Sequence, residues 1–276
     1  ATARIQAVAS LLHEKAPREV SLLNEPPAGR AQQALKQRAP GLLREVVPGA
    51  SALEPTHVMS NGRYSVALRA NGAGWSRWGH VGLTRWRDDA LRDSFGSFFY
   101  LREPGKAVSA SLTQHPAPDP SAYYLSTYHA DRVCFDAVWP DKKARTTVWV
   151  SPEDDIEFRQ VEIHNLGHET MEIELLSAFD VTLTDSRADE AHPAFTSLFV
   201  HAEWLSRHRA LSFWRTPRLD SEPGVHATHF LAQSDASVQG IDVQTSRQCW
   251  LGRNRDVSQP LGQVMRVEHG ESDEPL

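Results

Sequence analysis

The sequence predicts a mainly β protein, built as one large antiparallel β-sandwich (a super-sandwich) with a short helical segment at its N-terminal end. Two observations lead to this fold class. From Val58 onward, many short alternating segments are separated by turn residues, which favours a sandwich over a parallel sheet. One segment, residues 171–183, alternates over its whole length, and a strand of that length is typical of a large sandwich.

The N-terminal part of the chain is predicted to differ from the rest. Residues 3–14 should form a helix, because apolar residues recur at helical spacing and Pro17 follows. Prolines and glycines then interrupt the chain between residues 39 and 56, which favours an extended connection. Residues 1–55 are therefore expected to be a helical and extended linker, and residues 56–276 to be the sandwich domain.

The first strands of the sandwich enclose a glycine-rich turn. Residues 64–69 alternate between two faces, and Asn71-Gly72-Ala73-Gly74 tolerates the positive φ of a turn. A second strand ends this stretch at residues 98–101. A slip in the alternation near Gln160 predicts a β-bulge. Further strands are expected at residues 106–111, 123–130, 133–139, 145–150, 156–164, 198–204, 210–214 and 225–233.

The segment of residues 171–183 is the clearest predicted strand. Its other face changes from charged at Glu172 and Glu174 to apolar at Leu176, so the strand should pass from solvent to beneath another element. One continuous apolar face is expected to contain Met171, Ile173, Leu175, Ser177, Phe179, Val181 and Leu183.

Composition narrows the classes of protein that fit. The net charge of −6 argues against a nucleic-acid partner, which needs a basic face. The sequence has neither a run of about 20 apolar residues nor the pattern of a signal peptide, so this chain is expected to be soluble, without membrane insertion. The two cysteines, Cys134 and Cys249, are too few for a disulfide framework, which fits a reducing compartment.

Tryptophan and arginine residues gather between residues 75 and 92, after the glycine turn. Flat indole faces can cover the C–H side of a sugar ring, and guanidinium groups can bond its oxygens. Trp75, Arg77, Trp78 and Arg85 are therefore candidate substrate-binding residues. The same residues also fit an aromatic core with arginine ion pairs at a sheet edge, and the sequence leaves both interpretations open.

The strongest candidate site is a polar loop, TDSRADEAHPAF, at residues 184–195. It follows the long strand and carries Asp185, Arg187 and His192 among other ionisable residues. Polar loops on a rigid sheet are where binding groups usually lie. A solvated turn is the alternative interpretation.

Other motifs lack the partners that their chemistry needs. Residues 189–192 spell DEAH, but no phosphate-binding Gly-x-x-x-x-Gly-Lys-Ser/Thr loop accompanies them. Thirteen histidines show no zinc-ligand spacing; His226 and His229 should point to opposite faces of a strand. Neighbouring carboxylates such as Asp154 and Asp155 cannot lie on opposite sides of one glycosidic bond. No metal and no cofactor is expected.

Several ordered motifs carry a resemblance to a known family. The chain contains MSNGRYSV, GAGWSRW, LTRWRDD, RDSFGSFFYLRE, VSPEDDIEFRQVEIHNLG, ADEAHPAFTSLFVHAEW and CWLGRNR, in that order. This arrangement resembles the phosphorylase-like region of bacterial cyclic β-1,2-glucan synthases. That region belongs to the glycoside phosphorylase family that includes cellobiose phosphorylase. The resemblance is weakest over residues 17–55.

The resemblance implies a place in a larger enzyme. Family members have an amino-terminal β-sandwich, a helical linker, an α/α barrel with the active site and a small terminal domain, and this chain resembles the sandwich. Residues 1–25 would be the tail of a preceding domain. The sandwich would continue past residue 276, which would leave an open sheet edge and favour a homodimer. The parent protein is expected at the bacterial inner membrane, with this region in the cytoplasm.

The resemblance also implies a function. The region would control the length of a β-1,2-glucan by inverting phosphorolysis, with inorganic phosphate as the co-substrate. Phosphate is the nucleophile, so the reaction needs one general acid, which in the family lies on the barrel. No residue of this chain is therefore expected to be catalytic. The sandwich would support the barrel and bring Asp185, Arg187 and His192 towards a β-glucan oligosaccharide.

Three alternatives stay open on the sequence. The chain could be a stand-alone carbohydrate-binding module, which the tryptophan and arginine residues allow. It could be the N-terminal domain of a disaccharide phosphorylase of the cellobiose type. It could also be a purely structural interaction domain.

Overall fold

The computed structural model describes residues 43–50, 53–88, 93–105, 110–217, 222, 224–260 and 262. The chain divides into two compact units, Ala1–Leu42 and Leu43–Leu276, and every described residue belongs to the second. The helix predicted at residues 3–14 and the sheet edge predicted at the end of the chain lie outside the described residues.

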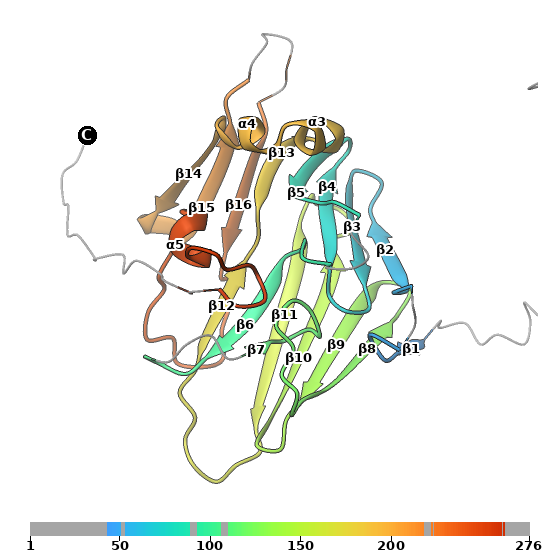
Figure 1. Cartoon of the computed structure of the whole chain (residues 1–276), viewed down its shortest axis with the longest axis vertical. Helices are drawn as coiled ribbons and strands as arrows, with labels where there is room; N and C mark the ends of the chain where they lie inside the picture. The colour runs from blue at the N-terminus through green and yellow to red at the C-terminus, as the bar shows by residue number, and fades with distance from the viewer. Residues whose placement is uncertain are drawn as a thin grey trace, which may run out of the picture. The chain divides into compact units, whose positions relative to one another are not determined.

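Antiparallel β-structure dominates the described residues, as predicted (Figure 1). Sheet A has the order β1-β8-β9-β10-β11. Its strands are β1 (Arg44–Val46), β8 (Tyr123–Tyr128), β9 (Arg132–Val138), β10 (Lys142–Val150) and β11 (Glu157–Asn165). β1 lies within the segment predicted to be a linker, but it pairs with β8, with Arg44 opposite Tyr128. The sheet structure therefore starts before residue 56.

Two further sheets lie against sheet A. Sheet B has the order β13-β5-β4-β3-β2, and sheet C has the order β12-β6-β7. The strands of sheet B are β2 (Thr56–Ser60), β3 (Tyr64–Arg69), β4 (Gly74–Trp78), β5 (Val81–Thr84) and β13 (Val181–Asp185). Those of sheet C are β6 (Phe98–Arg102), β7 (Ala110–Ser111) and β12 (Glu174–Ala178).

A fourth sheet and three short helices complete the described elements. Sheet D has the order β14-β15-β16. Its strands are β14 (Val200–Leu205), β15 (Ala210–Arg215) and β16 (His226–Phe230). The α-helices are α3 (Ser186–Ala191), α4 (Pro193–Ser197) and α5 (Arg247–Leu251), and a 3-10 turn, η1 (Ser206–His208), joins β14 to β15.

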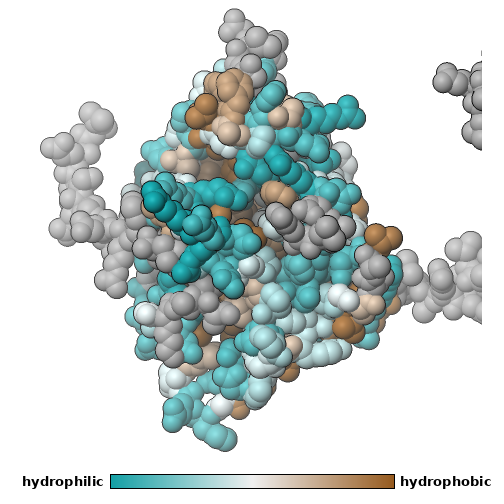
Figure 2. Space-filling view, in the orientation of Figure 1, coloured by the Kyte–Doolittle hydropathy of each residue, from teal (hydrophilic) through white to brown (hydrophobic). Residues whose placement is uncertain are grey.

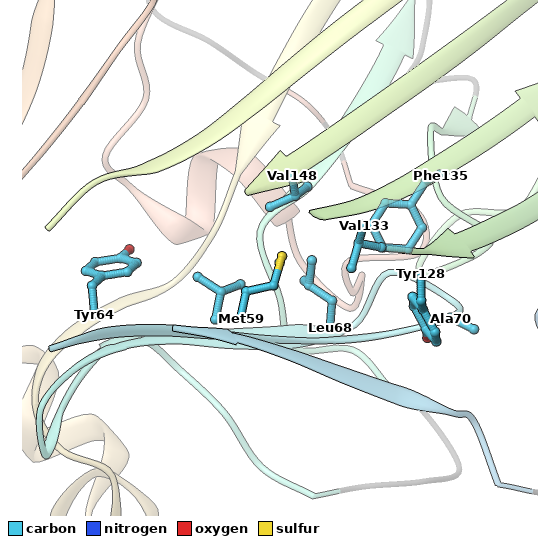
Figure 3. Packing of buried hydrophobic residues seen from close by; sticks show 9 residues of the cluster. Met59, Tyr64, Leu68, Ala70, Tyr128, Val133, Phe135 and Val148 are labelled. Atoms are coloured by element: carbon cyan, nitrogen blue, oxygen red, sulfur yellow. The ribbon is translucent and has the colours of Figure 1, made fainter. Parts of the chain in front are cut away.

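The core lies on one face of sheet A and confirms the sandwich. Met59, Tyr64 and Leu68 from β2 and β3 pack against Val133 and Val148 from β9 and β10 (Figure 3). A second buried cluster joins the same face of sheet A to sheet C; its members are Leu101, Ala110, Leu112, Tyr124, Ala137, Trp139 and Ala144. Sheets B and C therefore share sheet A as the opposite layer.

The long strand predicted at residues 171–183 is two strands, which corrects the prediction. β12 pairs with β6 in sheet C, and β13 pairs with β5 in sheet B. Because the chain changes sheet near Asp180, the surface that it must bury changes too. Leu176 lies in a buried cluster, whereas Leu175, on the predicted apolar face, is 43% exposed.

The bulge predicted near Gln160 is also absent. β10 and β11 pair continuously from Lys142 opposite Asn165 to Val150 opposite Glu157. Glu157 and Arg159 of β11 face inward, and their polar groups form hydrogen bonds between the layers. Because these inward residues are polar, the sequence pattern looks as if the alternation had shifted by one residue. The side chain of Glu157 accepts hydrogen bonds from Arg159, Ser76 and Tyr64.

Candidate functional site

The polar loop predicted at residues 184–195 is a helical corner, formed by α3 and α4. β13 ends at Asp185, whose Oδ1 accepts a hydrogen bond from the backbone N–H of Arg187 at 2.9 Å and so caps α3. His192 separates the two helices, and Pro193 starts α4 at a position where its missing N–H costs nothing. We refer to residues 185–198 as the corner segment.

A buried ion pair holds the corner segment on sheet B. Nε of Arg85 donates to Oδ2 of Asp189 at 2.9 Å, and Nη2 donates to Oδ1 at 3.0 Å. The hydroxyl of Thr196 also donates to Oδ1, at 2.6 Å. Asp189 is only 3% exposed, so this pair is shielded from water. Two-bond Arg–carboxylate geometry is among the strongest polar contacts in proteins.

Sheet D also holds the corner segment. Nη1 of Arg215, at the end of β15, donates to the backbone oxygen of Thr196 at 2.8 Å. Nη2 of Arg85 also donates to the hydroxyl of Ser197 at 3.0 Å. The corner segment is therefore fixed by arginines from two sheets, and its outward residues are presented on a rigid support.

The outward face of the corner segment carries the three residues predicted from the loop. The side chains of Asp185, Arg187 and His192 are all exposed. Phe195 and Leu198 are also exposed, the latter by 73%. In Figure 2, hydrophobic colour gathers at the top of the view, over α4. The segment thus combines charged, hydrogen-bonding and apolar groups on one surface.

The structure divides the tryptophan and arginine residues into separate places. Trp75 and Arg77 share one face of β4, with the guanidinium carbon of Arg77 4.2 Å from the centroid of the Trp75 ring. Trp78 points to the opposite face, and its Nε1 donates to Oδ2 of Asp155 at 2.7 Å. Arg85 joins the corner segment. No single surface unites these four candidates.

Two of the motifs that carry the resemblance bind each other. Nδ2 of Asn61, in the β2–β3 turn, donates to the backbone oxygens of Ser151 and Asp154 at 2.9 and 2.8 Å. Arg63 donates to Oδ1 of Asp155 at 2.9 Å and to the backbone oxygen of Glu153 at 2.7 Å. The MSNGRYSV motif is therefore a clamp between sheets B and A. This architectural role was not anticipated from the sequence.

Three motifs converge on one small cavity, which the sequence analysis missed. Arg85, Phe95 and Trp250, from LTRWRDD, RDSFGSFFYLRE and CWLGRNR, are among its lining residues. Asp180 also lines it and lies 3.4 Å from Nε of Arg247. The cavity holds about 40 Å³, which is enough for a few waters but not for a sugar ring. Beside the cavity, Trp250 of α5 packs edge-on against Tyr100 of β6, with ring centroids 5.6 Å apart, which holds α5 against sheet C.

Neither a metal centre nor a membrane helix is found among the described residues. Within them, no group of three or more His, Cys, Asp or Glu side chains could hold a metal ion. None of the described helices has the length and apolar character needed to cross a bilayer.

Comparisons with known proteins agree with the family that the motifs indicate. The family model described as "Glycosyl hydrolase 94, supersandwich domain" matches residues 47–273. The chain is also 31% identical, over 264 residues, to a cyclic beta-(1,2)-glucan synthase, NdvB, of Rhizobium meliloti (strain 1021). That match covers 92% of this chain but only 9% of the synthase. The chain therefore belongs to the glycosyl hydrolase 94 supersandwich domain family.

Proposed function

We propose that this chain is the non-catalytic sandwich domain of a cyclic β-1,2-glucan synthase. Its region of the enzyme would control glucan chain length by inverting phosphorolysis of β-glucosides, with inorganic phosphate as the co-substrate. The family membership and the similarity to a named glucan synthase support this proposal. The identity to that synthase favours a glucan over a disaccharide such as cellobiose as the substrate.

A supporting role fits the chemistry of the described residues. The buried carboxylate of Asp189 already accepts hydrogen bonds from Arg85 and Thr196, so it is not placed to transfer a proton to a substrate. The small cavity has no room for a glucosyl unit. The catalytic acid would therefore come from an α/α barrel of the same parent chain, which we propose as the partner of this domain. We further propose that the parent lies at the bacterial inner membrane, with this region in the cytoplasm and with the domain able to form a homodimer.

One observation carries the proposed sugar contact: the buried Arg85–Asp189 pair fixes a segment whose outward residues include Arg187 and His192. Arg187 makes no ion pair with any other described residue, so its guanidinium can bond hydroxyl oxygens of a substrate. His192 can donate to or accept from the same kind of group. One carboxylate oxygen of Asp185 caps α3, and the other can accept a hydrogen bond from a substrate hydroxyl.

The alternative of a carbohydrate-binding module built on Trp75 is less well supported. The guanidinium of Arg77 lies over the Trp75 ring, so that ring has one face already engaged. Trp78 is held by Asp155 on the opposite side of the sheet. The indole rings of Trp75 and Trp78 therefore do not form a shared flat platform for a sugar ring.

The proposal is tested with the parent enzyme and two arginine variants. Arg187→Ala should raise KM for β-1,2-glucan about tenfold, because one charge-assisted hydrogen bond is lost, while the unfolding midpoint stays unchanged. Arg207→Ala is the matched control, because Arg207 is also exposed but lies in η1, at the other end of β14. Equal KM values for the two variants would show that Arg187 does not contact the sugar.

The non-catalytic role is tested with this chain alone. It is incubated with β-1,2-glucan and inorganic phosphate, and release of glucose 1-phosphate is measured. We expect no release. Release above the level of a heat-denatured sample would show that the chain contains an active site and would refute the supporting role.

A further inference from the structure

The outward face of sheet D carries a row of three rings. The register places His201 of β14 opposite Trp214 of β15, and Trp214 opposite His226 of β16. The rings of His201 and Trp214 have centroids 5.4 Å apart and planes 21° from parallel. Both histidines are exposed, and Trp214 is half-buried between them. We refer to these three residues as the ring row.

The other face of sheet D fixes the ring row in place. Phe213, next to Trp214, is buried and packs edge-on against Phe179 at 5.8 Å between centroids. Arg215, on the other side of Trp214, is also buried and holds Thr196 of the corner segment. Nε2 of His201 lies 2.9 Å from the hydroxyl of Thr216, which orients that imidazole. The row therefore needs little ordering before it binds a ligand.

The neighbouring positions on the same face supply polar groups. Two residues further along each strand, Glu203, Ser212 and Thr228 form a second row across the sheet. Indole and imidazole rings pack against the C–H face of a sugar, while a carboxylate and two hydroxyls bond its oxygens. A row of flat rings beside a row of hydrogen-bonding groups suits a neutral, hydroxyl-rich polymer.

The ring row lies at the end of sheet D that adjoins the corner segment, although Arg215, which bonds that segment, lies on the opposite face of the sheet. α4 ends at Ser197, and β14 starts at Val200, so His201 lies at the end of sheet D that adjoins α4 (Figure 1). Trp214 stacks on His201 through one face, as Trp75 does under Arg77, so a sugar would contact the remaining exposed parts of the three rings.

We propose that the ring row is a binding site for glucosyl units of a β-1,2-glucan, a second sugar-contacting surface beside the one proposed on the corner segment. This inference rests on the proposed function for the identity of the ligand. The contact is an accessory one: it retains the polymer and performs no chemistry.

The test is a titration of this chain with linear β-1,2-glucan oligosaccharides, followed by saturation-transfer NMR. We expect weak binding by the unchanged chain and a dissociation constant about tenfold higher for Trp214→Ala. Trp149→Ala is the matched control: Trp149 also lies on an outward sheet face and stacks on a cross-strand ring, that of Phe158, at 5.0 Å. The control should bind within about twofold of the unchanged chain.

Several results would overturn the ring row as a site. These are no detectable glucan binding by the unchanged chain, an equal loss of glucan affinity in Trp214→Ala and Trp149→Ala, or an unchanged glucan affinity in Trp214→Ala. Trp214→Phe, which keeps a ring on the sheet, separates loss of folding from loss of contact and should retain most of the affinity. If Arg187→Ala left the KM of the parent enzyme unchanged, the sugar contact proposed at the corner segment would be refuted. Glucan binding at the ring row would not be affected, so the two proposals fail separately.

Discussion

Arg85 and Asp189 are 104 residues apart in the sequence, yet they form a two-bond ion pair beneath the corner segment. Arg85 follows β5 directly, and Asp189 lies in the middle of α3. The pair therefore ties the direction of α3 to the end of one strand of sheet B. The outward direction of Arg187 and His192 depends on this contact, although neither takes part in it.

Removing one partner of this pair should destabilise the fold strongly. Arg85→Ala would leave Asp189 buried without a counter-charge, and we expect the free energy of unfolding to fall by about 3–5 kcal/mol in chemical denaturation. Arg132→Ala is the control, because the Arg132–Asp131 pair is exposed at 45% and 71% and should contribute at most about 1 kcal/mol. A loss for Arg85→Ala no larger than that of the control would show that the pair is dispensable.

The clamp between sheets B and A should depend on one asparagine. Asn61→Ala removes two donated bonds to the β10–β11 turn and two accepted bonds from Arg63 and Tyr64. We expect a loss of about 2–3 kcal/mol in the free energy of unfolding. Asn165→Ala removes one donated and one accepted bond, both within one local turn, so it should cost less than about 1 kcal/mol. Equal costs would contradict an inter-sheet role for Asn61.

The sequence predicted the sandwich well because alternation records which face of a strand is buried. It predicted the split of residues 171–183 poorly, because β12 and β13 form one alternating run while their burial partners change. The bulge predicted at Gln160 arose from the same limitation: Glu157 and Arg159 are polar yet point inward, where they bond each other. Periodicity cannot distinguish a satisfied polar interior from a break in the strand.

The candidate site was predicted in part. The corner residues Asp185, Arg187 and His192 are together because they are close in the sequence. The separation of Trp75 from Trp78 follows from their spacing of three, once Gly74–Trp78 is recognised as a strand; the glycine and the charged residue in it obscured that strand. The role of Arg85 could not be predicted, because no local pattern identifies a partner as distant as Asp189.

Gly74 should tolerate no side chain. A Cβ at this position would lie 2.0 Å from the backbone oxygen of Ala67, which is fixed in the β3–β4 pairing. Gly74→Ala should therefore lower the free energy of unfolding by at least about 3 kcal/mol, because the backbone must move apart. At Gly240 a Cβ would meet nothing within 4 Å, so Gly240→Ala should stay within about 1 kcal/mol of the unchanged chain. Similar melting temperatures for the two variants would contradict the close approach of β3 and β4.

The stability of the fold should fall at alkaline pH because of buried tyrosines. Burial, followed by the charge of Glu157, raises the pKa of Tyr64 above its ordinary value, and burial does the same for Tyr100 and Tyr128. The unfolded chain releases these phenolic protons near pH 10, while the folded chain keeps them. Above pH 10 the folded state therefore binds more protons than the unfolded state, and the free energy of unfolding must decrease as pH rises.

Phenolate absorbance and denaturation together check this expectation. Below pH 10 the three tyrosines should leave stability independent of pH; above it, each should remove up to about 1.4 kcal/mol per pH unit until the fold is lost. Tyr64→Phe should make this slope shallower by one such contribution, because phenylalanine has no proton to release. If phenolate absorbance from these residues rose near pH 10 while the circular dichroism of the sheets stayed constant, the hydroxyl of Tyr64 could not be buried beside Glu157 between the two layers.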